Sequence, residues 1–546
     1  MIGLIEKLKI SLLALLLLSA CLLIKAQAAS SISASSDVHI AVTELPFSFS
    51  PFSSVSASPS DFQLLTDNSR SSSAQYSHLF FDPLVRWGQD KKLQYRLITK
   101  IETLRDNNTR FFLKKGIVFH SGNALTSKDV IWSFNEALKN KYLYQKLQHI
   151  IEIKEIDDYQ LDIQTQLTPA QLLDYMSHLF ILDSEFYQKN KIDHNAQQSA
   201  ISPSVNTLAL SGTGPYRVNS FYSDVSLRVE ANKTYWGEQP MLTSLNFVKV
   251  KSKQSRLYAL LAGDVDISEA ISNKNINSVD LLDDKHIYQT APINTLFLLI
   301  NDLNNPLFAD DSVRNAVHLS INQAGMLKHI LNGTGTVGNS FASTTFANGQ
   351  HAFEPVQLIK KSISPKPSTE QSVLLQPIYD TKLAKLLLDT VSRPRKLSLL
   401  VKIDENAHTK EATLAIENML LKVGIKLLVT EVESMKRWND LQFEHDLMLT
   451  NWHTSLLNRD NIYQNIFQNS SLTNYLSLRF NEEKQPLSMQ QKIKLFDQYQ
   501  SQDFIVPLFS QNEIWATDKK FDLKHVFSVN AIPYWHQLTL STEEPQ

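Results

Sequence analysis

The chain has 546 residues, 43% of them hydrophobic and 20% charged, with a formal net charge of −2. This length exceeds what one hydrophobic core normally supports, so it predicts several domains. The near-neutral charge excludes a general attraction to nucleic acid or anionic lipid, and we expect no nucleic-acid partner. Glycine, with 14 residues, is too scarce for a protein built around glycine-rich phosphate loops.

The N-terminus has the pattern of an export signal. Two lysines precede an apolar run over residues 10–24, and the small-residue sequence Ala-Gln-Ala that follows ends at Ala28. We therefore predict a signal peptide over residues 1–28 and export to the periplasm. A serine- and alanine-rich tether over residues 29–37 follows, with nothing to bury.

A second processing site overlaps the first. The sequence Leu-Ser-Ala-Cys ends at Cys21, the only cysteine in the chain, and fits a lipoprotein box. The apolar run continues past Cys21, which favours soluble export over lipidation, but both routes stay open. The run is shorter than the about 20 residues that a membrane span needs. With one cysteine, no disulfide can form within the chain.

The first third of the chain is predicted to contain strands and amphipathic helices. Residues 38–42 alternate like a strand. Thr126 and Asp129 form a capping pair in front of a helix. Its predicted apolar face consists of Val130, Ile131, Phe134, Ala137 and Leu138. A hairpin over residues 151–165 and a helix over residues 169–182 follow.

The central stretch, residues 212–267, has the clearest local pattern. Gly212 and Gly214 flank a threonine just before a proline, which predicts a tight turn with positive φ. Two strands follow, over residues 225–229 and 245–250.

A helix over residues 255–262 is then predicted to end at Gly263 in a left-handed C-cap. A short strand begins directly after it. One side of this helix is predicted to carry Leu257, Leu260 and Leu261.

The second half alternates helices with strands. The continuously apolar residues 296–300 predict a buried strand, and residues 311–331 predict one long helix with Val313, Ala316, Val317 and Ile321 inward. A helix over residues 412–423, closed by Gly424, leads into a strand over 425–432. This alternation predicts an α/β protein with a mostly parallel, helix-covered sheet.

Sequence motifs for catalysis or cofactor binding are weak. Residues 333–338 satisfy GxGxxG, but they follow a helix rather than a strand, so we interpret them as a loop. The 15 histidines are scattered without HExxH, and no GxSxG occurs. We therefore predict no cofactor, no metal site and no enzyme activity.

Three short pieces carry a family resemblance. GTGPYRV begins at Gly212, NKTYW ends at Trp236, and ALLAGDVDI ends at Ile267. In this order they resemble the signature region of the family 5 extracellular solute-binding proteins, the peptide-binding receptors of ABC importers. The resemblance extends over about residues 38–540.

The resemblance implies a two-lobed α/β clamshell with a hinge, in which the first lobe has an extra domain. Domain I takes residues 38–65, 205–292 and 513–546, domain II takes 66–204, and domain III takes 293–512. It also implies a monomeric substrate-binding subunit that delivers peptides to membrane permease subunits. No bond is made or broken in that function.

The resemblance also places candidate ligand-binding residues. In the peptide receptors a strand ends in a tryptophan, and Trp452 occupies that position here, followed by His453. We expect Trp452 to form a half-exposed stacking wall, with His453 in the same wall. Met435 and Trp438 lie shortly before the strand and resemble the family's aromatic stacking position.

One position departs from the family pattern. In the peptide receptors an aspartate three residues after the tryptophan pairs with the peptide's α-amino group, whereas this chain has Ser455. A serine hydroxyl accepts a hydrogen bond but brings no compensating charge. Asp460 is either a replacement carboxylate or a solvated loop residue, and both interpretations stay open.

Two alternatives come from other classes. A secreted hydrolase requires a nucleophile and a base that meet only in three dimensions. A transcription regulator that reuses the module needs a DNA-binding domain, and about 37 largely apolar residues before the first strand are too few for one. Within the transport class, a non-peptide ligand such as haem, a nickel complex or a sugar also stays open.

Overall fold

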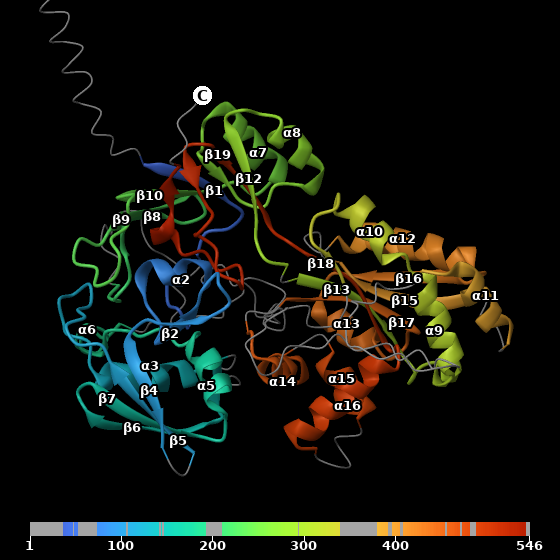
Figure 1. Cartoon of the computed structure of the whole chain (residues 1–546), viewed down its shortest axis with the longest axis horizontal. Coiled ribbons are helices and arrows are strands. Elements are labelled where there is room, and N and C mark those ends of the chain that lie inside the picture. Colours follow the sequence, from blue (N-terminus) through green and yellow to red (C-terminus); the bar gives the residue numbers. More distant parts are fainter. Residues whose placement is uncertain are drawn as a thin grey trace, which may run out of the picture.

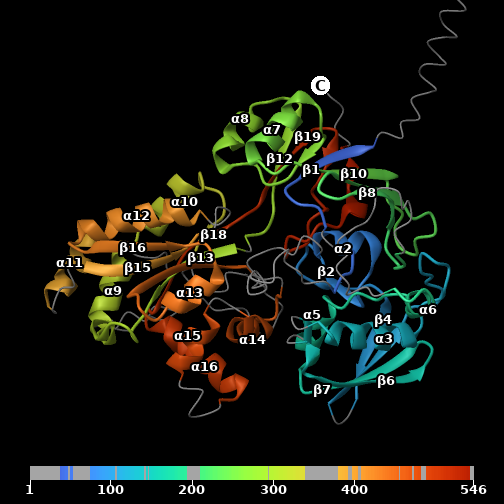
Figure 2. The same ribbon diagram turned by 180° about the vertical axis from the view of Figure 1, so that it is seen from behind.

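The computed structural model describes residues 37–46, 49–52, 74–104, 107–140, 143–144, 147–192, 210–292, 294–338, 379–390, 396–403, 408–453, 456–469, 472–480 and 487–541. The predicted signal peptide, Cys21, the tether up to Ser36, and Ser455 lie outside these ranges. The described chain forms two lobes, each built around its own sheet (Figures 1 and 2).

A seven-stranded mixed sheet forms the centre of the first lobe, in the order β12-β19-β11-β1-β10-β9-β8. Its strands are β1 (Val38–Val42), β8 (Tyr216–Tyr222), β9 (Ser226–Ala231), β10 (Ser244–Lys249), β11 (Ile267–Ser268), β12 (Lys285–Gln289) and β19 (Ile514–Asp518). The helices beside it are α7 (Lys253–Ala262) and α8 (Ile276–Asp280). Strand β1 is central and parallel to both neighbours, so residues from three distant parts of the chain meet there.

A smaller α/β unit completes the first lobe. Its antiparallel sheet has the order β4-β5-β7-β6, with β4 (Ile98–Thr103), β5 (Asn108–Leu113), β6 (Ile150–Asp157) and β7 (Gln160–Thr165). The helices are α2 (Ala74–Phe80), α3 (Ser127–Leu138), α5 (Pro169–Met176) and α6 (Ser184–Lys189), and β2 (Val85–Trp87) pairs with β3 (Leu93–Tyr95). The capping pair predicted for α3 is confirmed, because Thr126 and Asp129 bond reciprocally.

The second lobe is a six-stranded sheet with helices on both faces, in the order β14-β18-β13-β17-β15-β16. The strands are β13 (Asn294–Ile300), β14 (Thr336–Val337), β15 (Lys396–Lys402), β16 (Lys426–Val432), β17 (Leu447–His453) and β18 (Ile505–Gln511). The helices are α9 (Asp311–Ser320), α10 (Gln323–Ile330), α11 (Thr381–Asp389), α12 (Thr409–Lys422), α13 (Met435–Leu441), α14 (Arg459–Asn469), α15 (Thr473–Arg479) and α16 (Met489–Ser501).

Alternation along β13 explains how both faces of this sheet are covered. Leu296, Leu298 and Ile300 belong to the apolar core beneath α9 to α12. Phe297 and Leu299 point to the opposite face and join the core beneath α13 to α16. Successive side chains of a strand alternate between faces, so a continuously apolar strand requires a helix layer on each side. The buried strand predicted at residues 296–300 is confirmed.

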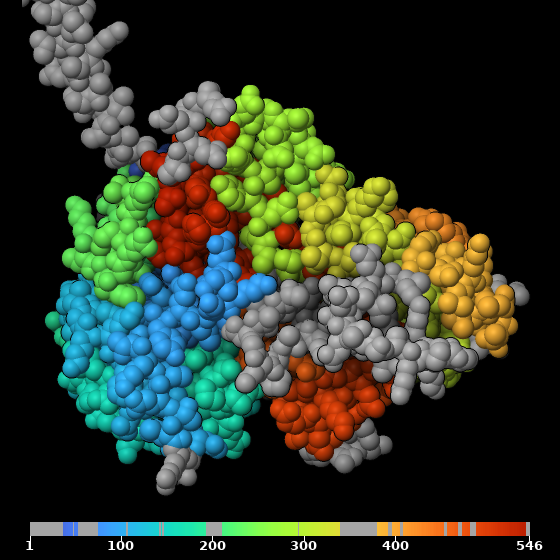
Figure 3. Space-filling view, viewed as in Figure 1, coloured from blue at the N-terminus to red at the C-terminus, as the bar shows by residue number. Residues whose placement is uncertain are grey.

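The two lobes are connected by two neighbouring passages of the chain. One runs from β12 to β13, and the other from β18 to β19. The passages are tied together, since Asn512 Nδ2 donates to the Thr290 carbonyl at 2.7 Å and Glu513 N donates to Thr290 Oγ1 at 3.0 Å. The C-terminal segment therefore returns to the first lobe, where Figure 3 shows it in red between blue and green parts.

Several predicted elements were wrong. The sheets are mixed rather than mostly parallel: among the described strands, only β1 with β10 and β11, and β15 with β16 and β17, are parallel. The long helix predicted over residues 311–331 is two helices, because Ile321 adopts an extended ψ of 114° and Asn322 caps α10. The helix predicted over residues 169–182 ends at Met176.

The two signature glycines have a different role from the predicted one. Neither has a positive φ; instead, a Cβ on Gly212 would lie 2.1 Å from the Phe80 carbonyl oxygen, and one on Gly214 would lie 2.3 Å from the Phe80 carbonyl carbon. Close backbone approach to α2 therefore requires glycine. The left-handed cap at Gly263 is confirmed, with φ 79°, but Leu261 is 43% exposed rather than inward.

Candidate functional site

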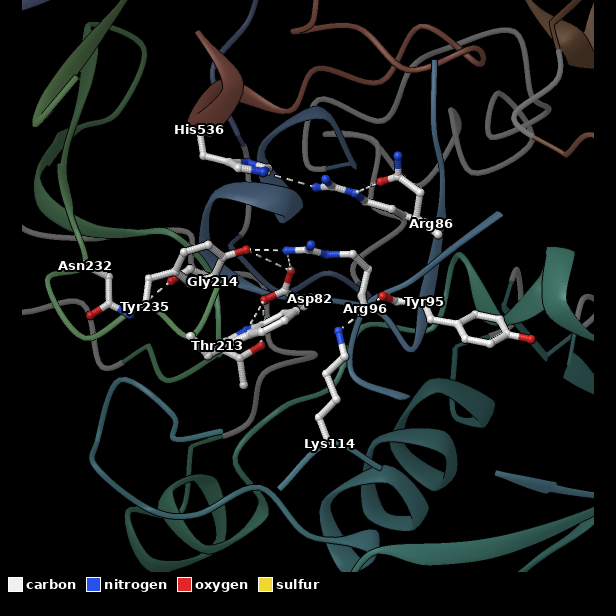
Figure 4. Close-up of polar contacts among 12 residues, drawn as sticks. Asp82, Arg86, Tyr95, Arg96, Lys114, Thr213, Gly214, Asn232, Tyr235 and His536 are labelled. Carbon is white, nitrogen blue, oxygen red and sulfur yellow. Dashed lines mark hydrogen bonds and ion pairs between the residues drawn. The ribbon is translucent and has the colours of Figure 1, made fainter. Parts of the chain in front are cut away.

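The family signature converges on one buried carboxylate (Figure 4). Asp82 Oδ2 accepts hydrogen bonds from Thr213 Oγ1 and Trp236 Nε1, each at 3.0 Å. Asp82 Oδ1 accepts from Arg96 Nη2 at 3.2 Å and from the Tyr235 hydroxyl at 3.4 Å. Two signature pieces, GTGPYRV and NKTYW, supply Thr213, Tyr235 and Trp236, whereas Asp82 and Arg96 lie outside the signature. These contacts join the two parts of the first lobe.

The backbone around this carboxylate is held in the same way. Gly214 N donates to the Phe80 carbonyl at 2.9 Å, and Asn232 Nδ2 donates to the Gly214 carbonyl at 3.2 Å. Arg217 Nε donates to Asn232 Oδ1 at 3.2 Å. Every one of these contacts is internal to the lobe. The signature therefore maintains the fold.

A buried guanidinium lies beside the Asp82 cluster. Arg86 is 4% exposed; its Nε donates to Gln94 Oε1 at 2.9 Å and its Nη1 lies 3.2 Å from His536 Nε2. Arg86 always donates, so His536 Nε2 accepts and the ring proton lies on Nδ1, which has no partner in the described part of the chain. Burial is the main cause that lowers the pKa of His78 and of His536 well below the usual range.

The strand predicted to supply the ligand-stacking wall lies inside the second lobe. Trp452, opposite Thr295 in the β13–β17 ladder, is 2% exposed instead of half-exposed, because α13 to α16 cover its face of the sheet. His453 ends the strand as predicted. The expected half-exposed wall is therefore wrong for Trp452 in this arrangement.

The two residues predicted before the strand are also buried. Met435 and Trp438 lie on α13, and they are 4% and 0% exposed. Both belong to the same apolar core as Trp452. The structure thus brings three of the predicted site residues together, but as packing residues beneath the sheet.

Asp460 lies in the first turn of α14, close to the boundary between the lobes. Its backbone N–H donates to Asn458 Oδ1 at 3.1 Å, which is a helix N-cap contact. The charges of Asp174 and Asp460, after burial as the main cause, raise the pKa of Tyr175 on α5 of the first lobe. Asp460 therefore lies near the opposing lobe.

Sequence reasoning missed a carboxylate that joins the lobes. Asp174 on α5 is 0% exposed and accepts from three groups of the second lobe: Leu457 N at 3.1 Å, Asn458 N at 3.1 Å and Asn461 Nδ2 at 2.9 Å. Trp87 Nε1 of its own lobe donates to it at 2.9 Å. Burial raises the pKa of Asp174, and these hydrogen bonds oppose that rise.

Further contacts surround this carboxylate, where α5 and α14 lie side by side in both views (Figures 1 and 2). Asn461 Nδ2 also donates to the Gln171 carbonyl at 3.0 Å. Trp87, Leu457 and Val529 form a small apolar cluster across the boundary. The segment that follows β17 is thus held by the first lobe.

The described residues contain neither a candidate metal cluster nor a candidate membrane-spanning helix. No group of three or more histidine, cysteine, aspartate or glutamate side chains in these ranges is arranged to hold a metal ion. No helix within the same ranges is long and apolar enough to cross a membrane.

Two lobes with separate sheets, joined by a pair of neighbouring passages, define the clamshell class of solute-binding proteins. The model of the bacterial extracellular solute-binding proteins, family 5, matches residues 92–474. The chain belongs to this family of binding proteins.

Relatives and solved structures agree with this assignment. The chain is 24% identical over 248 residues to the peptide transport periplasmic protein SapA of Haemophilus influenzae, covering 44% of this chain and 40% of SapA. It is 19% identical over 365 residues to the oligopeptide-binding protein AppA of Bacillus subtilis, covering 63% of this chain and 62% of AppA. The matched regions thus span about half the length of these curated relatives.

The fold is shared with solved structures of low identity. A putative peptide binding protein AppA from Clostridium difficile has a TM-score of 0.70 at 17% identity, covering 93% of this chain and 100% of that one. A dipeptide binding protein from Pseudoalteromonas, solved with Met-Leu, has a TM-score of 0.66 at 17% identity, covering 92% and 100%. At this identity the likeness is one of fold.

Proposed function

We propose that the protein is the exported substrate-binding subunit of an ABC importer, and that it binds peptides between its two lobes and delivers them to membrane permease subunits. The observation that supports this most directly is the arrangement of two lobes, each with its own sheet, that are joined by two passages and meet again at α5 and α14. Two lobes connected in this way are able to move about a hinge.

The domain assignment follows the same proposal. Domain I takes residues 38–65, 205–292 and 513–546, domain II takes 66–204, and domain III takes 293–512. A ligand that contacts domain III and the first lobe together shifts the population toward the closed form. The permease then recognises that form, and no bond is made or broken.

Localisation is part of the proposal. Cleavage after Ala28 releases a soluble periplasmic protein, whereas lipidation of Cys21 anchors it to a membrane. Mass spectrometry of the mature N-terminus tests both routes. A first residue that is neither Ala29 nor a lipid-modified Cys21 contradicts export through this signal.

A nickel complex is the second candidate ligand. The chain is 22% identical over 298 residues to the nickel-binding periplasmic protein of Escherichia coli, covering 51% of this chain and 53% of that protein. Peptide remains the first candidate because the names of the SapA and AppA relatives specify peptides.

Native mass spectrometry of protein purified from periplasm distinguishes the candidates. A bound mass that fragments into amino acids supports the peptide proposal. A bound mass with the isotope pattern of nickel supports the alternative. Turnover of small peptides or esters by the pure protein contradicts a binding function and supports a hydrolase.

A further inference from the structure

One carboxylate of the first lobe holds the segment that follows β17 in the second lobe. The backbone N–H groups of Leu457 and Asn458 and the side-chain amide of Asn461 all point to Asp174. Asn458 also caps α14, since its Oδ1 accepts from Asp460 N and Asn461 N. Asp174 thus fixes the start of this helix from across the boundary.

The donors to Asp174 are all uncharged. No lysine, arginine or histidine in the described ranges forms an ion pair with it. A buried carboxylate without a counter-ion depends on its hydrogen bonds to offset the loss of water. The four N–H donors use its lone pairs, and three of these donors are present only when the lobes meet.

This arrangement acts on the equilibrium between two forms rather than on the fold of either lobe. When the lobes separate, water solvates Asp174 and its partners in the second lobe. When they meet without the carboxylate, Leu457 N and Asn458 N are buried with no acceptor, and Asn461 Nδ2 keeps only the Gln171 carbonyl. Removing the carboxylate therefore penalises only the closed form.

We propose that Asp174 is a positioning residue for ligand binding. It holds the segment after β17 against the first lobe, so that a fraction of the unliganded molecules is already closed. This inference rests on the proposed function, because it concerns closure around a solute. Ligand affinity rises with the fraction of protein in the binding-competent form. Asp174 thereby sets affinity without touching the ligand.

Spin-label distance measurements on the unliganded protein test the proposal. Lys154 on β6 and Lys494 on α16 are exposed and lie in different lobes, so the substitutions Lys154→Cys and Lys494→Cys report the separation of the lobes. Cys21, the only native cysteine, is replaced by serine. The wild-type background is expected to show a short-distance population.

Asp174→Leu keeps the approximate volume and removes the acceptor, so the short-distance population is expected to fall by about tenfold or more. Asn461→Ala removes one donor from the other side and is expected to give a smaller fall. If Asp174→Leu does not fold, Asn461→Ala is the variant that tests the proposal. Identical distance distributions in the wild-type background and in the folded variant overturn the proposal.

Asp183→Asn is the matched control. Asp183 is equally buried and accepts from Phe186 N at 3.0 Å and Ser211 Oγ at 2.8 Å, but these partners lie in its own lobe. This variant is expected to lose stability and keep the wild-type distance distribution. A fall in the short-distance population as large as that of Asp174→Leu assigns the effect to general loosening and overturns the proposal.

A mixture of random tetrapeptides separates this inference from the function on which it rests. If the mixture increases the short-distance population in the wild-type background, the peptide function stands. If it does not, the peptide proposal fails, while the unliganded comparison of Asp174→Leu with wild type still decides the role of Asp174.

Discussion

Trp236 Nε1 donates a hydrogen bond of 3.0 Å to Asp82 Oδ2 across 154 residues of the chain. The bond joins the end of one signature piece, NKTYW, to a carboxylate in the other part of the first lobe. Asp82 has Arg96 as its charged partner, and both side chains are largely buried. These contacts hold the two parts of the first lobe in one arrangement.

Asp82→Ala is expected to lower the free energy of unfolding by about 3–5 kcal/mol, because it leaves Arg96 buried without its counter-ion. Urea unfolding followed by tryptophan fluorescence measures the change. Ser488→Ala, which removes the exposed capping hydroxyl of α16, is the control and is expected to cost about 1 kcal/mol. Equal losses in the two variants contradict a special role for Asp82.

Arg86→Met is expected to stabilise the protein by less than the roughly 1–4 kcal/mol gained when a whole buried ion pair is replaced, because Gln94 Oε1 and His536 Nε2 lose their donor. Arg86 is buried, its hydrogen-bonding partners are Gln94 and His536, and no carboxylate in the described ranges forms an ion pair with it. Methionine keeps the apolar volume and removes the charge. Thermal unfolding measures the effect.

Arg96→Met provides the contrast to Arg86→Met, since Arg96 is paired with Asp82. It is expected to lower the melting temperature. If both substitutions lower it equally, the Arg86 charge is compensated in the folded protein and the prediction is wrong.

His120 is expected to make stability depend on pH. Burial lowers its pKa from 6.5 to about 4, while its contact with the Gly214 carbonyl at 3.0 Å acts in the opposite direction. The unfolded chain therefore binds the proton more tightly, and stability falls as pH decreases from 6.5 towards 4. At pH 5.5 the loss from this residue is about 1 kcal/mol.

His120→Gln tests this prediction, because glutamine retains an N–H donor for Gly214 and does not titrate. The free energy of unfolding is measured in urea at pH 7.5 and pH 5.5. The variant is expected to lose less stability between these values than wild type, although His78 and His536 still contribute in the same direction. If His120→Gln loses as much stability between pH 7.5 and pH 5.5 as wild type does, the pH dependence is due to other groups.

Local patterns identified much of the fold. The α3 helix, the β6–β7 hairpin, the buried strand β13 and the Gly263 cap depend on residues within a few positions of each other. Helix ends that depend on packing against distant residues were missed, because local spacing does not record them. The extended ψ of Ile321 separates α9 from α10, although the apolar spacing continues through this residue.

The candidate site was harder to predict, because its contacts are distant in sequence. Asp174 meets Leu457 across 283 residues, and nothing in the α5 sequence distinguishes it from an exposed helix aspartate. Trp452 was placed correctly at the end of β17. Its burial depends on helices α13 to α16, whose positions the strand sequence does not encode.

The amine preference of the site remains a prediction from Ser455 and Asp460. Ser455 brings no charge to pair with a peptide's α-amino group, so acetylation of that group is expected to change affinity by less than about 1.4 kcal/mol, a factor of ten. Loss of a buried charge pair instead costs about 2–5 kcal/mol. Calorimetry on matched free and acetylated peptides measures the difference.

Asp460→Asn decides between the two interpretations of Asp460. This residue lies near Tyr175 of the opposing lobe. If acetylation weakens binding strongly in wild type and has little effect in Asp460→Asn, Asp460 is the amine anchor and the expectation from Ser455 is wrong. If acetylation has a small effect in both proteins, the charge of the ligand's amino group does not determine affinity, and Asp460 is a helix-terminal residue.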